Sequence, residues 1–166
     1  MGLKLKNLPR GTEVYIDANI FLYSAFKHPI FGDSCINFLI KVDEGVFTGY
    51  VSDHILNEVF HKLMVAEVSK KFKMSVKNAI KHVNTNPNVI SNLETVWEEM
   101  DIIRSSNIQF LDSGILFPIF VRMSKRYNLM ATDAIHVAIM KKHNIANIAT
   151  NDSDFERVEW IKVWKP

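Results

Sequence analysis

The sequence predicts an α/β fold, in which helices cover both faces of a central, mainly parallel sheet of about five strands. Short runs of β-branched and aromatic residues recur along the chain, and the apolar residues between them repeat at three- and four-residue spacing. Strands separated by helices are joined by βαβ crossovers, which place them in parallel. The length of 166 residues fits one domain. We therefore expect a three-layer α/β/α architecture over residues 1–166.

Five segments have the composition of buried strands, with turn residues at their ends. They are Val14 to Ala18, Phe47 to Val51, Ile108 to Leu111, Asn147 to Thr150 and Trp160 to Trp164. The first of them follows a Gly11-Thr12 turn. Because all five are short and apolar, they are typical of strands that are buried on both faces of a sheet.

Seven segments between these strands have a helical apolar pattern. They run from Ile20 to His28, Asp33 to Asp43, Ser52 or Asp53 through Met64, Lys70 to Val83, Val89 to Ser105, Ile115 to Tyr127 and Thr132 to Met140. Pro29 ends the first helix, because the residue before a proline is pushed out of helical geometry. The second carries Ile40 on its expected apolar face and stops at Gly45. Thr132 is expected to cap the last helix.

The composition predicts a protein that works in a reducing compartment. Cys35 is the single cysteine and lies among apolar residues, so we expect a buried thiol rather than a disulfide. The first six residues carry two lysines and do not resemble a signal peptide. No uncharged apolar run approaches the ~20 residues that cross a bilayer. We therefore expect a cytoplasmic protein without a membrane partner.

Four acidic residues are expected at the same edge of the sheet. Asp17 lies at the polar end of the first predicted strand and Asp152 just after the fourth, whereas Glu58 and Asp133 lie near the starts of predicted helices. In such folds ligands bind beyond the carboxyl ends of the strands. Acids held close together repel one another, so that only a hard cation or shared protons would make the cluster tolerable. Any one of these acids alone would more simply be a helix cap.

The residues around these acids resemble those of the PIN domain, and most closely the VapC-type ribonucleases of prokaryotic toxin-antitoxin pairs. The resemblance spans nearly the whole chain. It is carried by four segments, which are Tyr15-Ile16-Asp17-Ala18-Asn19-Ile20, Leu56-Asn57-Glu58-Val59, Ala131-Thr132-Asp133-Ala134-Ile135-His136-Val137-Ala138 and Ala149-Thr150-Asn151-Asp152-Ser153-Asp154-Phe155. Each segment is weak by itself, but their order and the strands before the first and last make the combination specific.

The resemblance implies an endoribonuclease that hydrolyses RNA phosphodiester bonds with Mg²⁺ or Mn²⁺. Its metal-binding acids match Asp17, Glu58, Asp133 and Asp152, with Asp154 as a further candidate. Accessory polar residues match Asn19 and Thr150. Carboxylates suit these hard cations, and the chain offers no cysteine cluster for a softer metal. By analogy with the family, the protein is expected to be a homodimer and the toxin partner of a small antitoxin.

The chain departs from its family in length, because VapC proteins are commonly shorter. The additional residues form an extended helical segment at about 67–106. A basic stretch overlaps its start and suits a phosphodiester backbone. Its candidate RNA-binding residues are Lys62, Lys70, Lys71 and Lys73. A solvated helix face is the simpler explanation for each lysine taken alone.

Three alternatives remain open from the sequence. The chain could be a non-catalytic PIN-like module that binds RNA or a protein, or an RNA-processing nuclease outside a toxin-antitoxin system. A rival metal site is suggested by Glu58 with His61 and Asp133 with His136, whose i, i+3 spacing is that of di-iron helix bundles. Such bundles need four long helices and two further glutamates, whereas this chain has strand candidates. Both histidines are therefore expected to be packing residues.

Overall fold

A computed structural model describes residues 2–166. The chain divides into two compact units. The first, which we call the sheet unit, comprises residues 2–56 and 107–166, and the second, the helical unit, comprises residues 57–106. The extended segment expected at about 67–106 lies inside the helical unit. Each unit is described by itself.

The sheet unit is built on one sheet of six strands, all parallel, in the order β1-β6-β5-β2-β3-β4. The strands are β1 Leu3–Lys4, β2 Glu13–Ile16, β3 Thr48–Ser52, β4 Gln109–Leu111, β5 Asn147–Ala149 and β6 Lys162–Lys165. All five predicted strands are present. The sixth, β1, was not predicted, because two residues that pair with Trp164 and Lys165 carry no periodic pattern.

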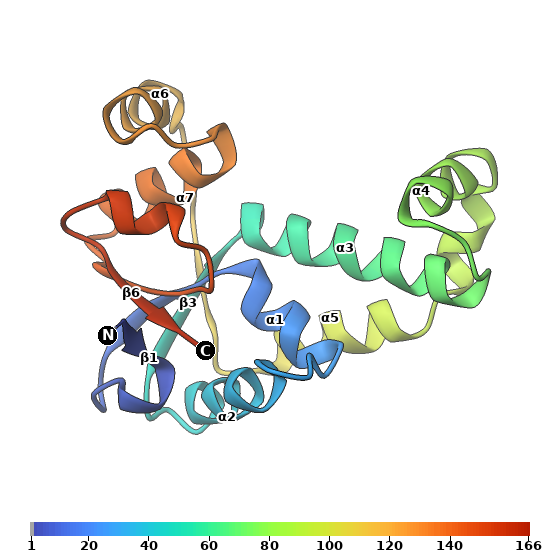
Figure 1. Cartoon of the computed structure of the whole chain (residues 1–166), viewed down its shortest axis with the longest axis horizontal. Helices are drawn as coiled ribbons and strands as arrows, with labels where there is room; N and C mark the ends of the chain where they lie inside the picture. The colour runs from blue at the N-terminus through green and yellow to red at the C-terminus, as the bar shows by residue number, and fades with distance from the viewer. Residues whose placement is uncertain (1) are drawn as a thin grey trace. The chain divides into compact units, whose positions relative to one another are not determined.

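Helices cover both faces of this sheet, with α1 and α2 on one side and α6 and α7 on the other (Figure 1). The helices of the sheet unit are α1 Ala18–Ala25, α2 Gly32–Asp43, α6 Phe117–Tyr127 and α7 Ala131–Lys142, with 3₁₀ turns η1 Leu5–Asn7 and η3 Asp154–Arg157. The predicted three-layer α/β/α class is confirmed. The helix α1 ends three residues before His28, because Lys27 adopts a left-handed conformation at φ 48°.

The helix α2 packs closely on the sheet. Its buried side chains include Cys35, Phe38 and Val42. A Cβ atom added to Gly49 on β3 would come within 2.6 Å of Val42 Cγ1, so the glycine permits this close approach. Ile40, which was expected on the apolar face, is 49% exposed, and that expectation was wrong. The helix stops at Gly45, whose φ of 72° favours glycine.

The predicted buried thiol is confirmed. Cys35 is fully buried and forms no disulfide, and burial raises the pKa of its thiol to about 12. Over the described residues, no helix is both long and apolar enough to cross a membrane.

The helical unit contains most of α3 Asp53–Lys71, followed by α4 Val76–Thr85, the 3₁₀ turn η2 Pro87–Asn92 and α5 Thr95–Ser105. A continuous helix from Lys70 to Val83 was predicted but is interrupted at Lys73, which has φ 50°. Ser75 then caps α4, because its hydroxyl accepts a hydrogen bond from the Asn78 amide. The helix expected from Val89 to Ser105 is not continuous either. Its first residues belong to η2, which ends at Asn92, and α5 begins only at Thr95.

Candidate active site at the carboxyl edge of the sheet

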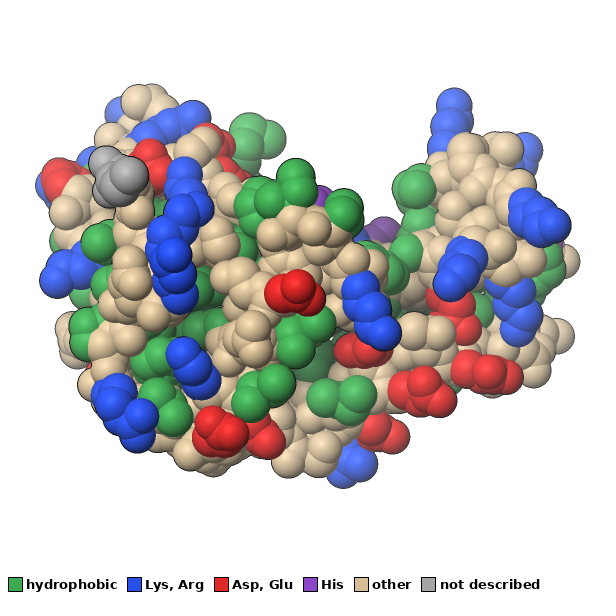
Figure 2. Space-filling view, turned by 60° about the horizontal axis from the view of Figure 1, so that its bottom comes forward, with side chains coloured by type: hydrophobic (Ala, Val, Ile, Leu, Met, Phe, Trp, Pro, Cys, Tyr) green, Lys and Arg blue, Asp and Glu red, His purple; other side chains and the backbone are tan. Residues whose placement is uncertain are grey.

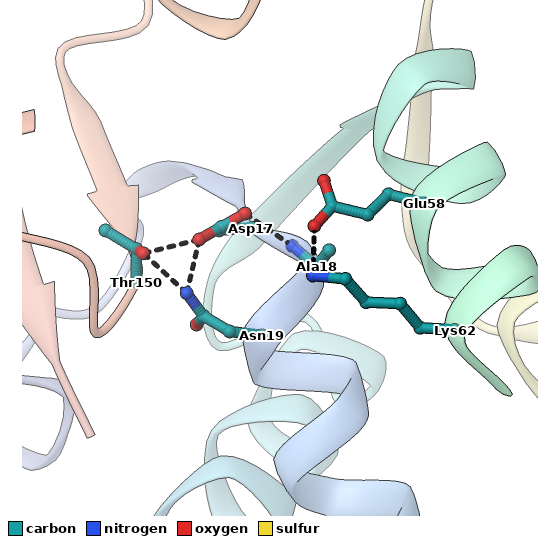
Figure 3. Close-up of polar contacts among 6 residues, drawn as sticks. All are labelled: Asp17, Ala18, Asn19, Glu58, Lys62 and Thr150. Carbon is teal, nitrogen blue, oxygen red and sulfur yellow. Dashed lines mark hydrogen bonds and ion pairs between the residues drawn. The ribbon is translucent and has the colours of Figure 1, made fainter. Parts of the chain in front are cut away.

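Asp17 is the residue around which polar groups of the sheet unit converge. It follows β2 directly and is only 8% exposed. Its Oδ1 accepts a hydrogen bond from the amide of Ala18 at 2.7 Å, and the residue thereby caps α1. Its Oδ2 accepts hydrogen bonds from the Thr150 hydroxyl at 2.5 Å and from the Asn19 side-chain amide (Figure 3). These donors hold the carboxylate in one orientation.

Thr150 and Asn19 form the rest of this arrangement. Thr150 follows β5, which lies beside β2 in the sheet, so both strands end at the same edge. The Asn19 amide nitrogen also donates to Thr150 Oγ1 at 2.9 Å, and its side-chain oxygen accepts from the amide of Asn151 at 3.3 Å. The structure thus brings Thr150 together with Asp17 and Asn19, which lie more than 130 residues earlier in the sequence.

The loop after β5 carries the next two acids. The amide of Asp152 donates to Thr150 Oγ1 at 3.0 Å, which ties Asp152 to the same network. Asp152 Oδ1 in turn accepts from the amide of Asp154 at 2.8 Å. Asp154 forms an ion pair with Arg157 at 2.8 Å. The Asp154 carboxylate is therefore engaged by a cation of its own turn.

Asp133 lies in the first turn of α7 and is half-buried. The capping residue of this helix is Met130, and Thr132 is exposed inside its first turn. The prediction that Thr132 caps the helix was therefore wrong. The helix begins earlier because Met130 already has extended backbone geometry and its carbonyl accepts from the Ala134 amide.

Glu58 lies in the second turn of α3, as predicted, and belongs to the helical unit. Its carboxylate pairs with Lys62 one turn later, at 2.5 Å (Figure 3). The other candidate RNA-binding residues, Lys70, Lys71 and Lys73, are all exposed. His61 is also exposed, so the expectation that it packs in the core was wrong.

One buried polar network was not predicted. The Tyr15 hydroxyl lies 2.6 Å from Ser52 Oγ and 3.1 Å from His136 Nδ1. All three residues are buried, and His136 Nε2 has no hydrogen-bond partner among residues 2–166. Burial, assisted by the nearby His54, lowers the pKa of His136 to about 4. A tyrosine between two aliphatic residues of a buried strand, Val14 and Ile16, was the sequence signal that could have indicated a polar partner in the core.

The oxygen atoms of Asp17 and Thr150 are of the kind that hard cations prefer, because carboxylate and hydroxyl oxygens are typical ligands of Mg²⁺ and Mn²⁺. Within residues 2–166, no three His, Cys, Asp or Glu side chains are gathered closely enough to hold a metal ion. The chemistry of these oxygen atoms fits such an ion. The assembly of the four acids around it stays a prediction. A di-iron helix bundle is excluded by the six-stranded sheet.

Comparisons with known proteins agree with this fold. A model of the PIN domain family matches residues 14–161. The ribonuclease VapC6 of Methanocaldococcus jannaschii is 36% identical over 74 residues, which are 43% of this chain and 48% of that protein. The chain therefore matches about half the length of this relative.

Solved structures are similar over most of the chain. VapBC2 from Rickettsia felis, bound to a DNA fragment from its promoter, has a TM-score of 0.60 at 18% identity, covering 93% of this chain and 98% of that chain. PAE2754 from Pyrobaculum aerophilum has a TM-score of 0.51 at 12% identity, covering 93% of this chain and 89% of that chain. A toxin-antitoxin complex from Klebsiella pneumoniae has a TM-score of 0.51 at 15% identity, covering 89% of this chain and 94% of that chain. These identities support the fold alone. Because the family match extends over most of the chain and the parallel sheet agrees with it, the chain belongs to the PIN domain family.

Proposed function

We propose that the protein is a divalent-metal-dependent endoribonuclease that hydrolyses RNA phosphodiester bonds. The observation that carries this proposal is the buried Asp17 carboxylate, fixed by Ala18, Asn19 and Thr150 at the carboxyl edge of a PIN-domain sheet. Similarity to a ribonuclease over 74 residues supports the same activity. A buried acid held by side chains from two strand ends is typical of a ligand-binding position in a parallel sheet.

The proposed ligands of the cation are Asp17, Glu58, Asp133 and Asp152. PIN-domain nucleases generally use divalent metal ions, and Mg²⁺ or Mn²⁺ suits four carboxylates. When bound, such an ion supplies a Lewis acid that neutralises charge on the phosphate and makes water more acidic. Asn19 and Thr150 orient Asp17. Asp154 is the weaker candidate for a fifth ligand, because its carboxylate already pairs with Arg157.

The cellular role that we propose is that of a toxin restrained by an antitoxin, acting as a homodimer. One of the similar structures is named as a toxin-antitoxin complex, and another is named VapBC2. A specific contact favours the alternative of a PIN module that binds RNA or protein without cleaving it. Glu58 is engaged by Lys62, and such a pairing competes with metal binding. An RNA-processing nuclease outside a toxin-antitoxin pair would share the chemistry and differ only in its partners.

The test is RNA cleavage by the purified protein with Mg²⁺, with Mn²⁺ and with a chelator. Cleavage is expected only with a divalent ion. Asp17→Asn should lower it by about 100-fold or more, because a neutral amide is a poor ligand for a hard cation. Asp33→Asn is the matched control, since Asp33 is an exposed acid in the first turn of α2, and it should keep the wild-type rate.

Circular dichroism and thermal melting establish that each variant is folded. If Asp17→Asn does not fold, Glu58→Gln replaces it, because Glu58 is a partly exposed ligand candidate. Cleavage in the presence of chelator, or equal activity of the wild type and these variants, would refute the proposal.

A further inference from the structure

Five lysines of the helical unit lie in other segments than four of its acids. Lys70, Lys71, Lys73, Lys77 and Lys81 are all exposed and lie at the end of α3, in the following turn and on α4. Four acids, Glu94, Glu98, Glu99 and Asp101, lie instead at the start of α5 and within it. In the part of Figure 2 that contains α4, basic side chains lie above a separate group of acidic ones.

The two remaining acids of this unit do not neutralise these five lysines. Glu67 uses both carboxylate oxygens to accept hydrogen bonds from the amides of Glu94 and Val96, at 2.7 and 2.9 Å, and so holds the start of α5. Glu58 pairs with Lys62. Among the residues that the structure describes, Lys70, Lys73, Lys77 and Lys81 form no ion pair. Their positive charge is therefore available to a polyanion.

An aromatic residue stands among these lysines in the sequence. Phe72, between Lys71 and Lys73, is 41% exposed. Its ring packs against His82 of α4 with 4.6 Å between the ring centres. The contact holds the ring across the turn between two helices, while a large part of it still faces solvent. A fixed and accessible aromatic ring is a surface on which an unpaired base can stack.

We propose that the turn between α3 and α4, together with the exposed face of α4, binds single-stranded RNA. We call this set of residues the turn surface, and it comprises Lys70, Phe72, Lys73, Lys77 and Lys81. Lys77 and Lys81 are one helical turn apart on α4, so they present two cations along one line. The lysines contact phosphates and Phe72 stacks on a base. The inference rests on the proposed ribonuclease function and names how that enzyme holds its substrate.

The test is binding of a fluorescently labelled, unstructured 20-nucleotide RNA, measured by anisotropy over a range of salt concentrations. The protein carries Asp17→Asn and the buffer contains chelator, so that no RNA is cleaved. In this background, the added changes Lys73→Gln, Lys77→Gln and Lys81→Gln should together weaken binding about tenfold or more. They should also reduce the slope of log affinity against log salt by about 2, because each phosphate contact in a single strand contributes about 0.7.

The aromatic contribution is tested separately with Phe72→Leu. This change should weaken binding of the single strand about tenfold without changing the salt slope, because stacking is lost and no charge is removed. Binding of a duplex RNA should be unaffected, since its bases are not available for stacking. Phe72→Tyr keeps the ring and should restore the wild-type affinity for the single strand.

The matched control changes Lys6, Lys125 and Lys162 to Gln, three exposed lysines of the sheet unit. It removes the same charge and should alter affinity less than twofold. Equal losses in the control and the turn-surface variant would contradict the proposal, as would unchanged RNA binding by the latter. Preferential binding of the turn surface to anionic vesicles or to a protein would also contradict it. Cleavage by the wild type is measured independently, so a failure of the nuclease function is distinguished from a failure of this surface.

Discussion

At the residue scale, Thr150 explains how a nearly buried carboxylate is kept in place. Its hydroxyl donates to Asp17 Oδ2 at 2.5 Å and accepts from both the Asn19 side chain and the Asp152 amide. One hydroxyl therefore connects Asp17, Asp152 and the side-chain amide of Asn19. Such outer contacts orient metal ligands, and their loss commonly weakens metal binding 10- to 100-fold. Thr150 is for this reason the strongest candidate for a positioning residue.

Thr150→Val keeps the shape of this side chain but removes its hydroxyl. We expect the affinity for Mn²⁺, measured by calorimetry without RNA, to fall by about 10- to 100-fold. Thr150→Ser retains the hydroxyl and should stay within about threefold of the wild type. If the valine variant binds Mn²⁺ as the wild type does, Thr150 does not position the ligand.

His136 makes stability depend on pH. Its folded-state pKa of about 4 lies below the usual 6.5, mainly through burial, with a smaller contribution from His54. Between these two values the unfolded state binds more protons, so stability should fall as pH decreases from about 6.5 to about 4. The full effect is about 3 kcal/mol at 1.36 kcal/mol per pKa unit. The Nδ1 atom of His136 also lies within hydrogen-bond distance of the Tyr15 hydroxyl.

Urea unfolding at pH 7 and pH 4.5 provides the measurement. His136→Gln cannot titrate, so its free energy of unfolding should decrease less than that of the wild type on acidification. Groups common to both proteins cancel in this difference. The same decrease in both proteins would show that His136 does not titrate as described.

At the scale of elements, the close packing of α2 on β3 depends on Gly49. A Cβ atom there would lie 2.6 Å from Val42 Cγ1 and 2.8 Å from Ile16 Cδ1. Gly49→Ala should therefore destabilise the protein by about 1–3 kcal/mol through overpacking. Chemical denaturation measures this change. Gly49→Ala combined with Val42→Ala should recover part of the loss, and a stable single variant would show that α2 moves away easily.

The strands and most helices could be predicted because their apolar periodicity is local. Several boundaries could not, because they depend on single backbone conformations or on distant partners. Lys73 at φ 50° interrupts the predicted helix, and a lysine, unlike a glycine, does not indicate a left-handed backbone conformation. The short strand β1 exists only through its pairing with β6. Ile40 lies in a helix as expected. Helical spacing alone, however, does not show which residues at the border of an apolar face are buried by the neighbouring elements.

The candidate site was predictable to a similar extent. The family resemblance matched both Asp17 and Thr150 to one site, and the structure joins them by a hydrogen bond. The engagement of Asp154 by Arg157 depends on a turn geometry that the sequence does not specify. The Tyr15, Ser52 and His136 network joins three segments, and only the folded sheet unit reveals it. Residue identity thus predicted the acids, whereas their partners required the fold.

At the scale of the whole molecule, the two units have different charge patterns that fit different tasks. The sheet unit holds Asp17 with its fixed donors, and the helical unit presents exposed lysines, Lys70, Lys73, Lys77 and Lys81, that form no ion pair with any described residue. Chemistry on a phosphodiester needs a cation near the reacting phosphate, and RNA binding needs positive charge along the backbone. The sheet unit carries Asp17, Asp133 and Asp152 of the proposed metal ligands, and the helical unit carries the proposed turn surface. Variants of Asp17 and of the turn surface are therefore expected to separate cleavage from RNA binding.

The measurement that tests the central claim most directly is a calorimetric titration of the metal-free protein with Mn²⁺, without RNA. We predict saturable binding to the wild type and to Asp33→Asn, and no detectable binding to Asp17→Asn at the same concentrations. This result would establish Asp17 as a ligand of the ion, independently of any substrate. Equal Mn²⁺ binding by the wild type and Asp17→Asn, or no binding by the folded wild type at millimolar Mn²⁺, would contradict the account.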